Sequence, residues 1–166
     1  MYNNLQQPIN TTIMRKLFSL LGIGLFALTF NAQDLVSVEG EFLADDGAKA
    51  NGTYKTFYNS GNVKAEYNFL DGQENGATTF FHENGKVKEV GTYDYGTKIG
   101  KWKSWSSNGE VIGVVNFNKK GKRDGVWEIW DDNGIKRASM EYKNGSRTGN
   151  WKVWNENGEL TNEKSY

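Results

Sequence analysis

The stretch Gly149–Gly158, with the sequence GNWKVWNENG, contains the pattern that organises the chain, because it recurs four more times upstream with substitutions. Its first and last glycines belong to two series with the same spacings of 24, 24, 25 and 24 residues, and a third glycine series follows the same period. The three series are Gly52, Gly76, Gly100, Gly125 and Gly149; Gly61, Gly85, Gly109, Gly134 and Gly158; and Gly72, Gly96, Gly121 and Gly145. A fixed period of this length predicts a tandem repeat array.

Aromatic residues keep the same period. Two residues after the first glycine of each repeat lie Tyr54, Thr78, Trp102, Trp127 and Trp151, and the repeats end near Phe69, Tyr93, Phe117, Tyr142 and Tyr166. Five residues after the first glycine lie Phe57, Phe81, Trp105, Trp130 and Trp154, which we call the aromatic ladder. The spacing places every ladder residue at the same position of its repeat.

Each repeat predicts a β-hairpin. A strand begins at the first glycine, an Asn-Gly or Ser-Gly pair suits a two-residue hairpin loop, and a second alternating strand follows, as in Val63–Phe69. A longer turn, such as Asp71–Gly76, leads to the next repeat, and no helical period occurs after residue 33. We therefore predict an all-β fold, an elongated and twisted antiparallel β-meander of about ten strands, solenoid-like in its repetition.

Symmetric closure of the Asn-Gly loops predicts the register. It places Tyr54 opposite Tyr67 and Thr56 opposite Ala65 on an apolar face, and it places Lys55 opposite Glu66 on the other face. The same register pairs Lys152 with Glu163, Phe57 with Lys64, Phe81 with Lys88, and Trp130 with Arg137. The last two pairs suit cation–π contact.

The aromatic ladder is the candidate site for binding a partner. Its residues lie two strands apart, roughly 9.6 Å per rung, and a continuous apolar stripe on a charged face marks an interaction surface. In the alternative interpretation the ladder folds over as a second layer of core. A one-residue bulge would also exchange the face of the ladder.

The N-terminal part differs from the repeats. Met14-Arg15-Lys16 precedes an apolar run, Leu17–Phe30, and Ala32 follows, which is the pattern of a secretory signal peptide; the alternative is an uncleaved anchor. We predict that residues 1–32 are an N-terminal extension and signal peptide cleaved near Ala32, and that the protein is exported to the periplasm, the outer surface or the medium. We assign residues 33–50 to a degenerate capping repeat and residues 51–166 to five repeats.

Few residues of this chain suggest chemistry. It has one histidine, His82, at a strand end, and no cysteine for a disulfide or a lipid anchor. Asp131-Asp132-Asn133-Gly134 could offer oxygens to calcium but lacks the full loop spacing, so a solvated turn is the simpler interpretation. We expect no catalytic residue, no cofactor site and no metal site, and therefore no enzyme.

Charge argues against a nucleic-acid partner. Lys plus Arg and Asp plus Glu both number 20, so no global field attracts a polyanion. The dense basic run Lys119–Arg123 occupies one exit turn, where it is either a solvated loop or a small patch for a membrane or nucleic acid. We expect no strong attraction to a membrane surface once the signal is removed.

The segment Tyr142–Trp151, YKNGSRTGNW, resembles the membrane occupation and recognition nexus (MORN) repeat, and the resemblance covers about residues 40–166 in five copies. It is most similar to the bacterial variant that is often assigned as the antitoxin of a toxin–antitoxin pair. The resemblance implies an elongated, twisted antiparallel sheet that binds proteins, with phospholipid binding proposed for some members.

These observations predict a non-enzymatic protein-interaction scaffold of the cell envelope or the secreted fraction, with an unidentified protein partner. One alternative is a carbohydrate or cell-wall binder, because Gly-x-Trp-x-x-Trp hairpins resemble the aromatic repeats of choline-binding modules and tryptophan suits sugar faces. Another alternative, from the family resemblance, is an antitoxin-like protein that neutralises its partner.

Overall fold

The computed structural model describes residues 36–38, 41–44 and 47–166; the predicted signal peptide lies outside these residues. The described residues form thirteen strands and no helix. The strands are β1 (Val36–Val38), β2 (Glu41–Leu43), β3 (Gly52–Phe57), β4 (Val63–Leu70), β5 (Gln73–Glu74), β6 (Gly76–Phe81), β7 (Val87–Asp94), β8 (Thr97–Trp105), β9 (Val111–Phe117), β10 (Gly125–Trp130), β11 (Lys136–Lys143), β12 (Ser146–Trp154) and β13 (Leu160–Ser165).

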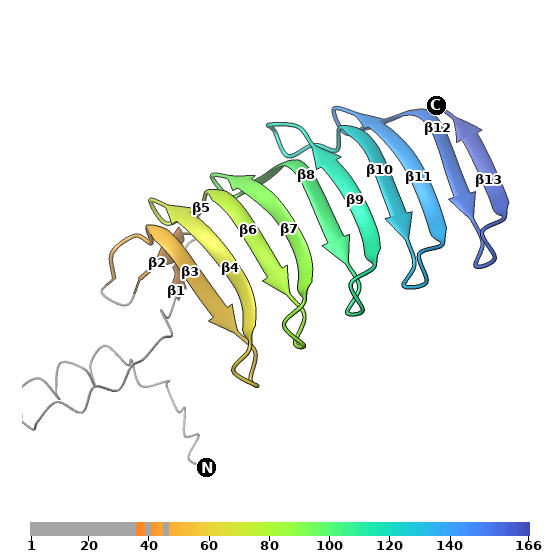
Figure 1. The fold of residues 1–166 in the computed structure, drawn as a ribbon. Coiled ribbons are helices and arrows are strands. Elements are labelled where there is room, and N and C mark those ends of the chain that lie inside the picture. The colour runs from red at the N-terminus through yellow and green to blue at the C-terminus, as the bar shows by residue number, and fades with distance from the viewer. Residues whose placement is uncertain (1–35, 39–40, 45–46) are drawn as a thin grey trace, which may run out of the picture.

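One open antiparallel sheet of eleven strands contains all the repeats. The order from β13 to β3 follows the chain, and β5 pairs with β4 beside this path. Five curved hairpins stand side by side in Figure 1, with the Asn-Gly loops at the lower end and the turns between repeats at the upper end. We call these ends the tip end and the exit end. The prediction of an elongated all-β meander of tandem hairpins is confirmed.

The loops at the tip end differ from the prediction. In the first hairpin Gly61 N–H donates to the Tyr58 carbonyl and Tyr58 N–H donates to the Asn62 carbonyl, which encloses three residues instead of two. The glycine alone has a positive φ, 86° at Gly61, whereas Ser60 does not. This is a type I turn followed by a left-handed glycine, the usual three-residue hairpin loop. The other four tips repeat the same two hydrogen bonds.

Two-residue loops lie instead at three of the four exit turns, whereas the turn Asn118–Lys122 repeats the hydrogen bonds of the tips. Leu70 pairs with Gln73 around Asp71-Gly72, and Lys143 pairs with Ser146 around Asn144-Gly145. Both central residues have positive φ, 50° and 78° at Asp71 and Gly72, as a type I′ turn requires. The predicted longer turn, Asp71–Gly76, is therefore a tight turn followed by the short strand β5.

A β-bulge in every hairpin decides the register. Away from the tips the predicted pairs are confirmed, because Tyr54 pairs with Tyr67, Lys55 with Glu66 and Thr56 with Ala65. Next to the tip Phe57 pairs with Val63 and leaves Lys64 as the extra residue, so the predicted pairing of Phe57 with Lys64 is wrong. The third loop residue shifts the register by one, and the bulge shifts it back. The extra residues of the other hairpins are Lys88, Ile112, Arg137 and Thr161.

Most of the buried apolar side chains of the sheet lie on one of its faces. The buried apolar residues of the described chain are Ala50, Tyr54, Ala65, Phe69, Trp102 and Tyr142. A row of ring contacts connects the last repeats: Phe117 to Trp127 at 5.3 Å, Trp127 to Tyr142 at 5.4 Å, Tyr142 to Trp151 at 5.0 Å and Trp151 to Tyr166 at 5.0 Å. We call this side of the sheet the stack face, and the opposite side the ladder face.

Two small residues make room for the largest buried ring. A Cβ added to Gly91 would overlap the indole of Trp102, and on the neighbouring strand Thr78 pairs with Gly91. Thr78 stands where most repeats have an aromatic residue, and its buried hydroxyl has no hydrogen-bond partner. Trp102 therefore fills a space that the second repeat leaves open.

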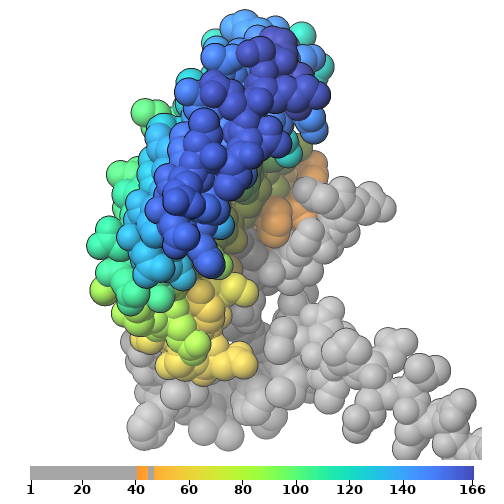
Figure 2. Space-filling model, turned by 90° about the vertical axis from the view of Figure 1, so that its right-hand side faces the viewer, coloured from red at the N-terminus to blue at the C-terminus, as the bar shows by residue number. Residues whose placement is uncertain are grey.

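A short two-stranded sheet, β1–β2, covers the start of the array. Phe42 packs on Phe69 with ring centroids 4.9 Å apart, and its N–H donates to the Gly72 carbonyl over 2.7 Å. The space-filling view from the β13 end shows the repeats one behind another as a narrow slab, with the orange β2 segment beside it (Figure 2). The described part of the predicted capping segment thus packs on the first hairpin.

Candidate functional site

The aromatic ladder lies next to the tip loops, at the last position of each outgoing strand. The bulge gives four of its five rings an aliphatic partner across the hairpin: Val63 for Phe57, Val87 for Phe81, Val111 for Trp105 and Leu160 for Trp154. Lys136 is the partner of Trp130. The ladder is therefore one half of an aromatic and aliphatic stripe that crosses all five hairpins.

Cations contact the ladder, although they are not the predicted ones. Lys103 Nζ lies 5.0 Å from the ring of Trp105, and Lys136 Nζ lies 5.3 Å from Trp130 and 6.0 Å from Trp154. Lys136 also pairs with Glu128 at 2.6 Å. The predicted contact of Trp130 with Arg137 is wrong, because Arg137 is the bulge residue and pairs with Asp131 at 3.6 Å. For the same reason Phe81 pairs with Val87 instead of Lys88.

The ladder stripe is partly open to solvent. Phe57, Val87 and Leu160 expose 38%, 36% and 48% of their surface, while Phe81, Trp105, Trp130 and Trp154 are half-buried. Among the described residues no ring contact joins two members of the ladder. Between the second and third tips the stripe borders a shallow hollow of about 570 Å³, lined by Gly85, Lys86, Val87, Val90, Trp105 and Gly109.

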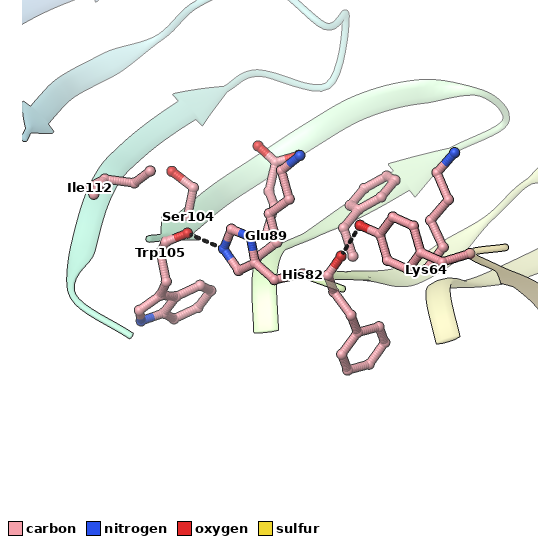
Figure 3. Close-up of a pocket in the computed structure, with 10 residues that line it drawn as sticks. Lys64, His82, Glu89, Ser104, Trp105 and Ile112 are labelled. Atoms are coloured by element: carbon pink, nitrogen blue, oxygen red, sulfur yellow. Dashed lines mark hydrogen bonds between the residues drawn. The ribbon is translucent and has the colours of Figure 1, made fainter. Parts of the chain in front are cut away.

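A second hollow opens at the tips of the first three hairpins and has a volume of about 350 Å³. We call it the tip hollow. Figure 3 shows that Glu89, Ser104 and Ile112 extend to one side of the strands, whereas the indole of Trp105 points to the other side. Phe80 also lines the tip hollow and contacts Tyr67, with ring centroids 5.6 Å apart. Tyr67 packs in turn on Phe69, so the tip hollow opens on the stack face.

His82 connects two neighbouring tips at this hollow. Its Nε2 lies 2.8 Å from the Trp105 carbonyl, which can only accept, so Nε2 carries the proton (Figure 3). In the repeat before, Tyr58 Oη donates to the Phe81 carbonyl over 2.7 Å from the same position. The histidine therefore replaces a tyrosine in a hydrogen bond between hairpins.

A series of cations over the stacked rings was missed by the sequence analysis. Arg123 lies 4.8 Å from the ring of Trp127 and donates to Tyr142 Oη over 2.9 Å, and Arg147 stands in the same way to Trp151 and Tyr166. Lys98 lies 3.7 Å from Trp102. These cations all stand two residues before a glycine of the first series, a periodicity that could have revealed them. Arg123, which the sequence analysis placed in a basic run, therefore lies over the rings of the stack face.

The second repeat has a carboxylate, Glu74, at this cation position. Burial raises the pKa of Glu74, and Lys98 partly opposes that effect. Burial, assisted by Glu74, also raises the pKa of Tyr93 to about 12 and that of Tyr67 in the same direction. The surroundings of these three side chains thus favour their neutral forms.

The remaining sequence candidates lie in ordinary structural roles. Asp131 Oδ1 accepts the N–H groups of Asn133 and Ile135, so this carboxylate stabilises its own tip loop. The described residues contain no group of three or more His, Cys, Asp or Glu side chains that could hold a metal ion. None of them belongs to a helix that is long and apolar enough to cross a membrane.

Comparison with protein-family models adds to this geometry. The model described as the MORN repeat variant matches residues 50–71, 74–95, 123–144 and 147–166, which is just over half of the chain. The chain belongs to the MORN repeat variant family. The region between the second and third matches contains the hairpin β8–β9, which has the same tip loop and the same bulge as the four matched MORN hairpins. The fold therefore has five hairpins where the family model matches four segments.

Other comparisons add little to this assignment. No curated protein matches the chain. A variant of S. aureus TarM, solved with fondaparinux, alpha-GlcNAc-glycerol and UDP, is 12% identical with a TM-score of 0.38, and the match covers 86% of this chain and 24% of that one. A second TarM structure is 14% identical with a TM-score of 0.36, covering 84% and 25%. The GtfA/B complex bound to UDP and GlcNAc is 9% identical with a TM-score of 0.31, covering 82% and 29%. The chain thus spans about a quarter of the length of these solved chains.

Proposed function

We propose that this MORN protein is a non-enzymatic interaction scaffold that acts after export, and that its ladder stripe contacts a protein partner. The composition and exposure of the stripe are the main support for this proposal. The stripe repeats an aromatic ring beside an apolar or basic partner at every hairpin, and Phe57, Val87 and Leu160 remain more than one third exposed. An apolar surface that crosses a whole molecule in this way is typical of an interaction site.

The open sheet supports the same function. The hairpins follow one another in a single sheet, so the ladder residues form one row along it. Ladder residues of successive repeats are two strands apart, roughly 9.6 Å, a spacing at which one extended partner can contact several rings. Lys103 and Lys136 beside the rings add charge that can select the partner.

A cross-linked pull-down from the envelope and secreted fractions of the source organism tests this proposal. Wild-type chain is compared with Trp130→Ala/Trp154→Ala and with Leu70→Ser/Val126→Ser, which alters exposed apolar side chains outside the ladder. We expect one defined protein to cross-link to the wild type and to the control variant but not to the ladder variant. Equal capture by all three chains would show that the ladder is not the contact surface.

The alternatives give different results in the same system. A glycan that quenches tryptophan fluorescence of the wild type, together with no captured protein, would favour the carbohydrate binder. A captured protein that is toxic, and whose toxicity the chain suppresses, would favour the antitoxin-like function. Export has its own test: the N-terminus of the purified protein should begin near Gln33, and an intact Met1 or Met14 would contradict cleavage.

A further inference from the structure

The tip hollow, which opens on the stack face, is a candidate for a second site, although the ladder residues Phe81 and Trp105 also line it. Its volume of about 350 Å³ falls within the range of pockets that bind small ligands or a single large side chain. Three hairpins contribute to it, from Tyr58 in the first to Ile112 in the third.

The third repeat contributes a small residue, Ser104, to the lining of the hollow. Ser104 pairs with Gly113, where the second repeat has Phe80 with Glu89 and the fourth has Ile129 with Ala138. A Cβ at Gly113 would come within 2.5 Å of Ser104 Oγ. The Ser104 hydroxyl occupies the space above Gly113, and Phe80 and Ile112 also line the hollow.

The bulges place two lysines at the hollow. Lys64 and Lys88 are the extra residues of the first two hairpins, both are exposed and both line the hollow. Neither lysine forms an ion pair in the described part of the chain; Lys64 Nζ lies 5.9 Å from the ring of Tyr58. The bulge residues of the last two hairpins differ, because Arg137 pairs with Asp131 and Thr161 donates to the Val153 carbonyl.

The negative charge of the lining is paired with a lysine of the same chain. Glu89 is the one carboxylate of the lining, and Lys98 lies 3.6 Å from it. The hollow therefore combines an apolar floor with two unpaired cations. A complementary ligand carries an apolar or aromatic group with carboxylates close to it on both sides.

We propose that the tip hollow binds an acidic peptide segment of a partner protein, which inserts an apolar side chain between Phe80 and Ile112 and pairs its carboxylates with Lys64 and Lys88. This inference rests on the proposed scaffold function and adds a second face to it. The mostly apolar lining favours a peptide over a nucleic acid, whose bases would bring a continuous phosphate backbone with them.

Fluorescence anisotropy with a labelled peptide of sequence EEFEE tests the inference on the full chain at low salt. The peptide should bind the wild type saturably, and Lys64→Glu/Lys88→Glu should weaken binding at least tenfold. The matched control is Lys101→Glu/Lys119→Glu, which reverses two exposed lysines outside the hollow and should change binding less than twofold. The peptides EEGEE and KKFKK should bind much more weakly than EEFEE.

Three results would overturn the inference: no saturable binding of EEFEE to wild-type chain, an equal loss in the two double variants, or stronger binding of a ten-nucleotide oligothymidylate than of the peptide. Circular dichroism of both double variants should match wild type, because the four substituted lysines are exposed. The ladder proposal fails separately, because its pull-down depends on Trp130 and Trp154 on the opposite face.

Discussion

At the scale of single residues, the two tryptophans of one Gly-x-Trp-x-x-Trp segment have different roles. Trp127 donates its indole N–H to the Asn116 carbonyl over 2.8 Å and packs between Phe117 and Tyr142 on the stack face. Trp130, three residues later, contacts Lys136 on the ladder face. The first tryptophan holds neighbouring hairpins together, whereas the second belongs to the surface that we propose for a partner.

The stability of two alanine variants tests this difference. We expect Trp127→Ala to lower the free energy of unfolding by about 3–5 kcal/mol, since it leaves a cavity between packed rings. Trp130→Ala should cost about 1–2 kcal/mol, because its ring has no ring contact in the described part of the chain and less packing is lost. Urea unfolding followed by far-UV circular dichroism measures both; equal losses would identify the ladder as core.

The raised pKa of Glu74 should make the free energy of unfolding depend on pH. Its pKa is raised in the folded state, so between the ordinary pKa of a glutamate and the raised value the folded chain binds more protons than the unfolded chain. The contribution of Glu74 to the free energy of unfolding therefore decreases as the pH rises through this window. We expect Glu74→Gln to be more stable than wild type at pH 7, with a smaller difference below the ordinary pKa.

Urea midpoints of both proteins at pH 7 and at pH 4 check this prediction. Glu156→Gln, at an exposed tip-loop carboxylate, is the control and should change neither midpoint. A Glu74→Gln variant that is less stable than wild type at pH 7 would mean that the attraction of Lys98 outweighs burial.

At the scale of the hairpin, a three-residue loop and a bulge cancel each other. The loop shifts the pairing by one residue, and Lys64 shifts it back, so Thr56 still pairs with Ala65. A polar side chain immediately before the three loop residues explains the loop in three repeats. Asp131 and Asn155 accept two backbone N–H groups of their loops, and Ser106 Oγ accepts one, contacts that favour a type I turn.

Single-residue deletions separate the bulge from the rest of the strand. Deleting Lys64 should leave a regular hairpin with the same pairs on both sides, at a cost of about 1 kcal/mol. Deleting Glu66 moves the residues on the tip side of β4 by one position and turns their side chains to the opposite face. We expect near-UV circular dichroism of the first deletion to match wild type, and that of the second to change; identical effects would contradict the bulge.

At the scale of the whole molecule, stability is distributed along a row of neighbours. Strand contacts connect each hairpin only to the next one, and the rings that join β11 to β12 repeat the contacts of earlier interfaces. Such arrays behave as nearly one-dimensional systems, in which each repeat adds its own interface.

A chain that ends at residue 144 tests this behaviour. Removing β12 and β13 deletes one interface, so the other four hairpins should stay folded and unfold at a lower urea concentration than the full chain. Tryptophan fluorescence of the shortened chain reports on the two remaining Gly-x-Trp-x-x-Trp segments. Loss of structure throughout the shortened chain would show that the array folds only as a single unit.

The sequence by itself determined the period, the five hairpins and the pairs in the middle of each hairpin. Every glycine of the three series has a positive φ, and a backbone that must adopt this conformation at fixed intervals selects glycine there. The alternation of Val63–Phe69 placed Tyr54 with Tyr67 and Lys55 with Glu66, because a strand has a period of two.

The tertiary structure alone decided the loop type, the bulge and the surfaces at the tips. An Asn-Gly pair suits both hairpin loops, since each needs a left-handed glycine, so local sequence could not choose between them. The tip hollow joins Lys64, Lys88 and Ile112, which are one repeat apart in sequence. Their proximity depends on how neighbouring hairpins align in the sheet. The local sequence pattern of a single repeat does not specify this long-range pairing.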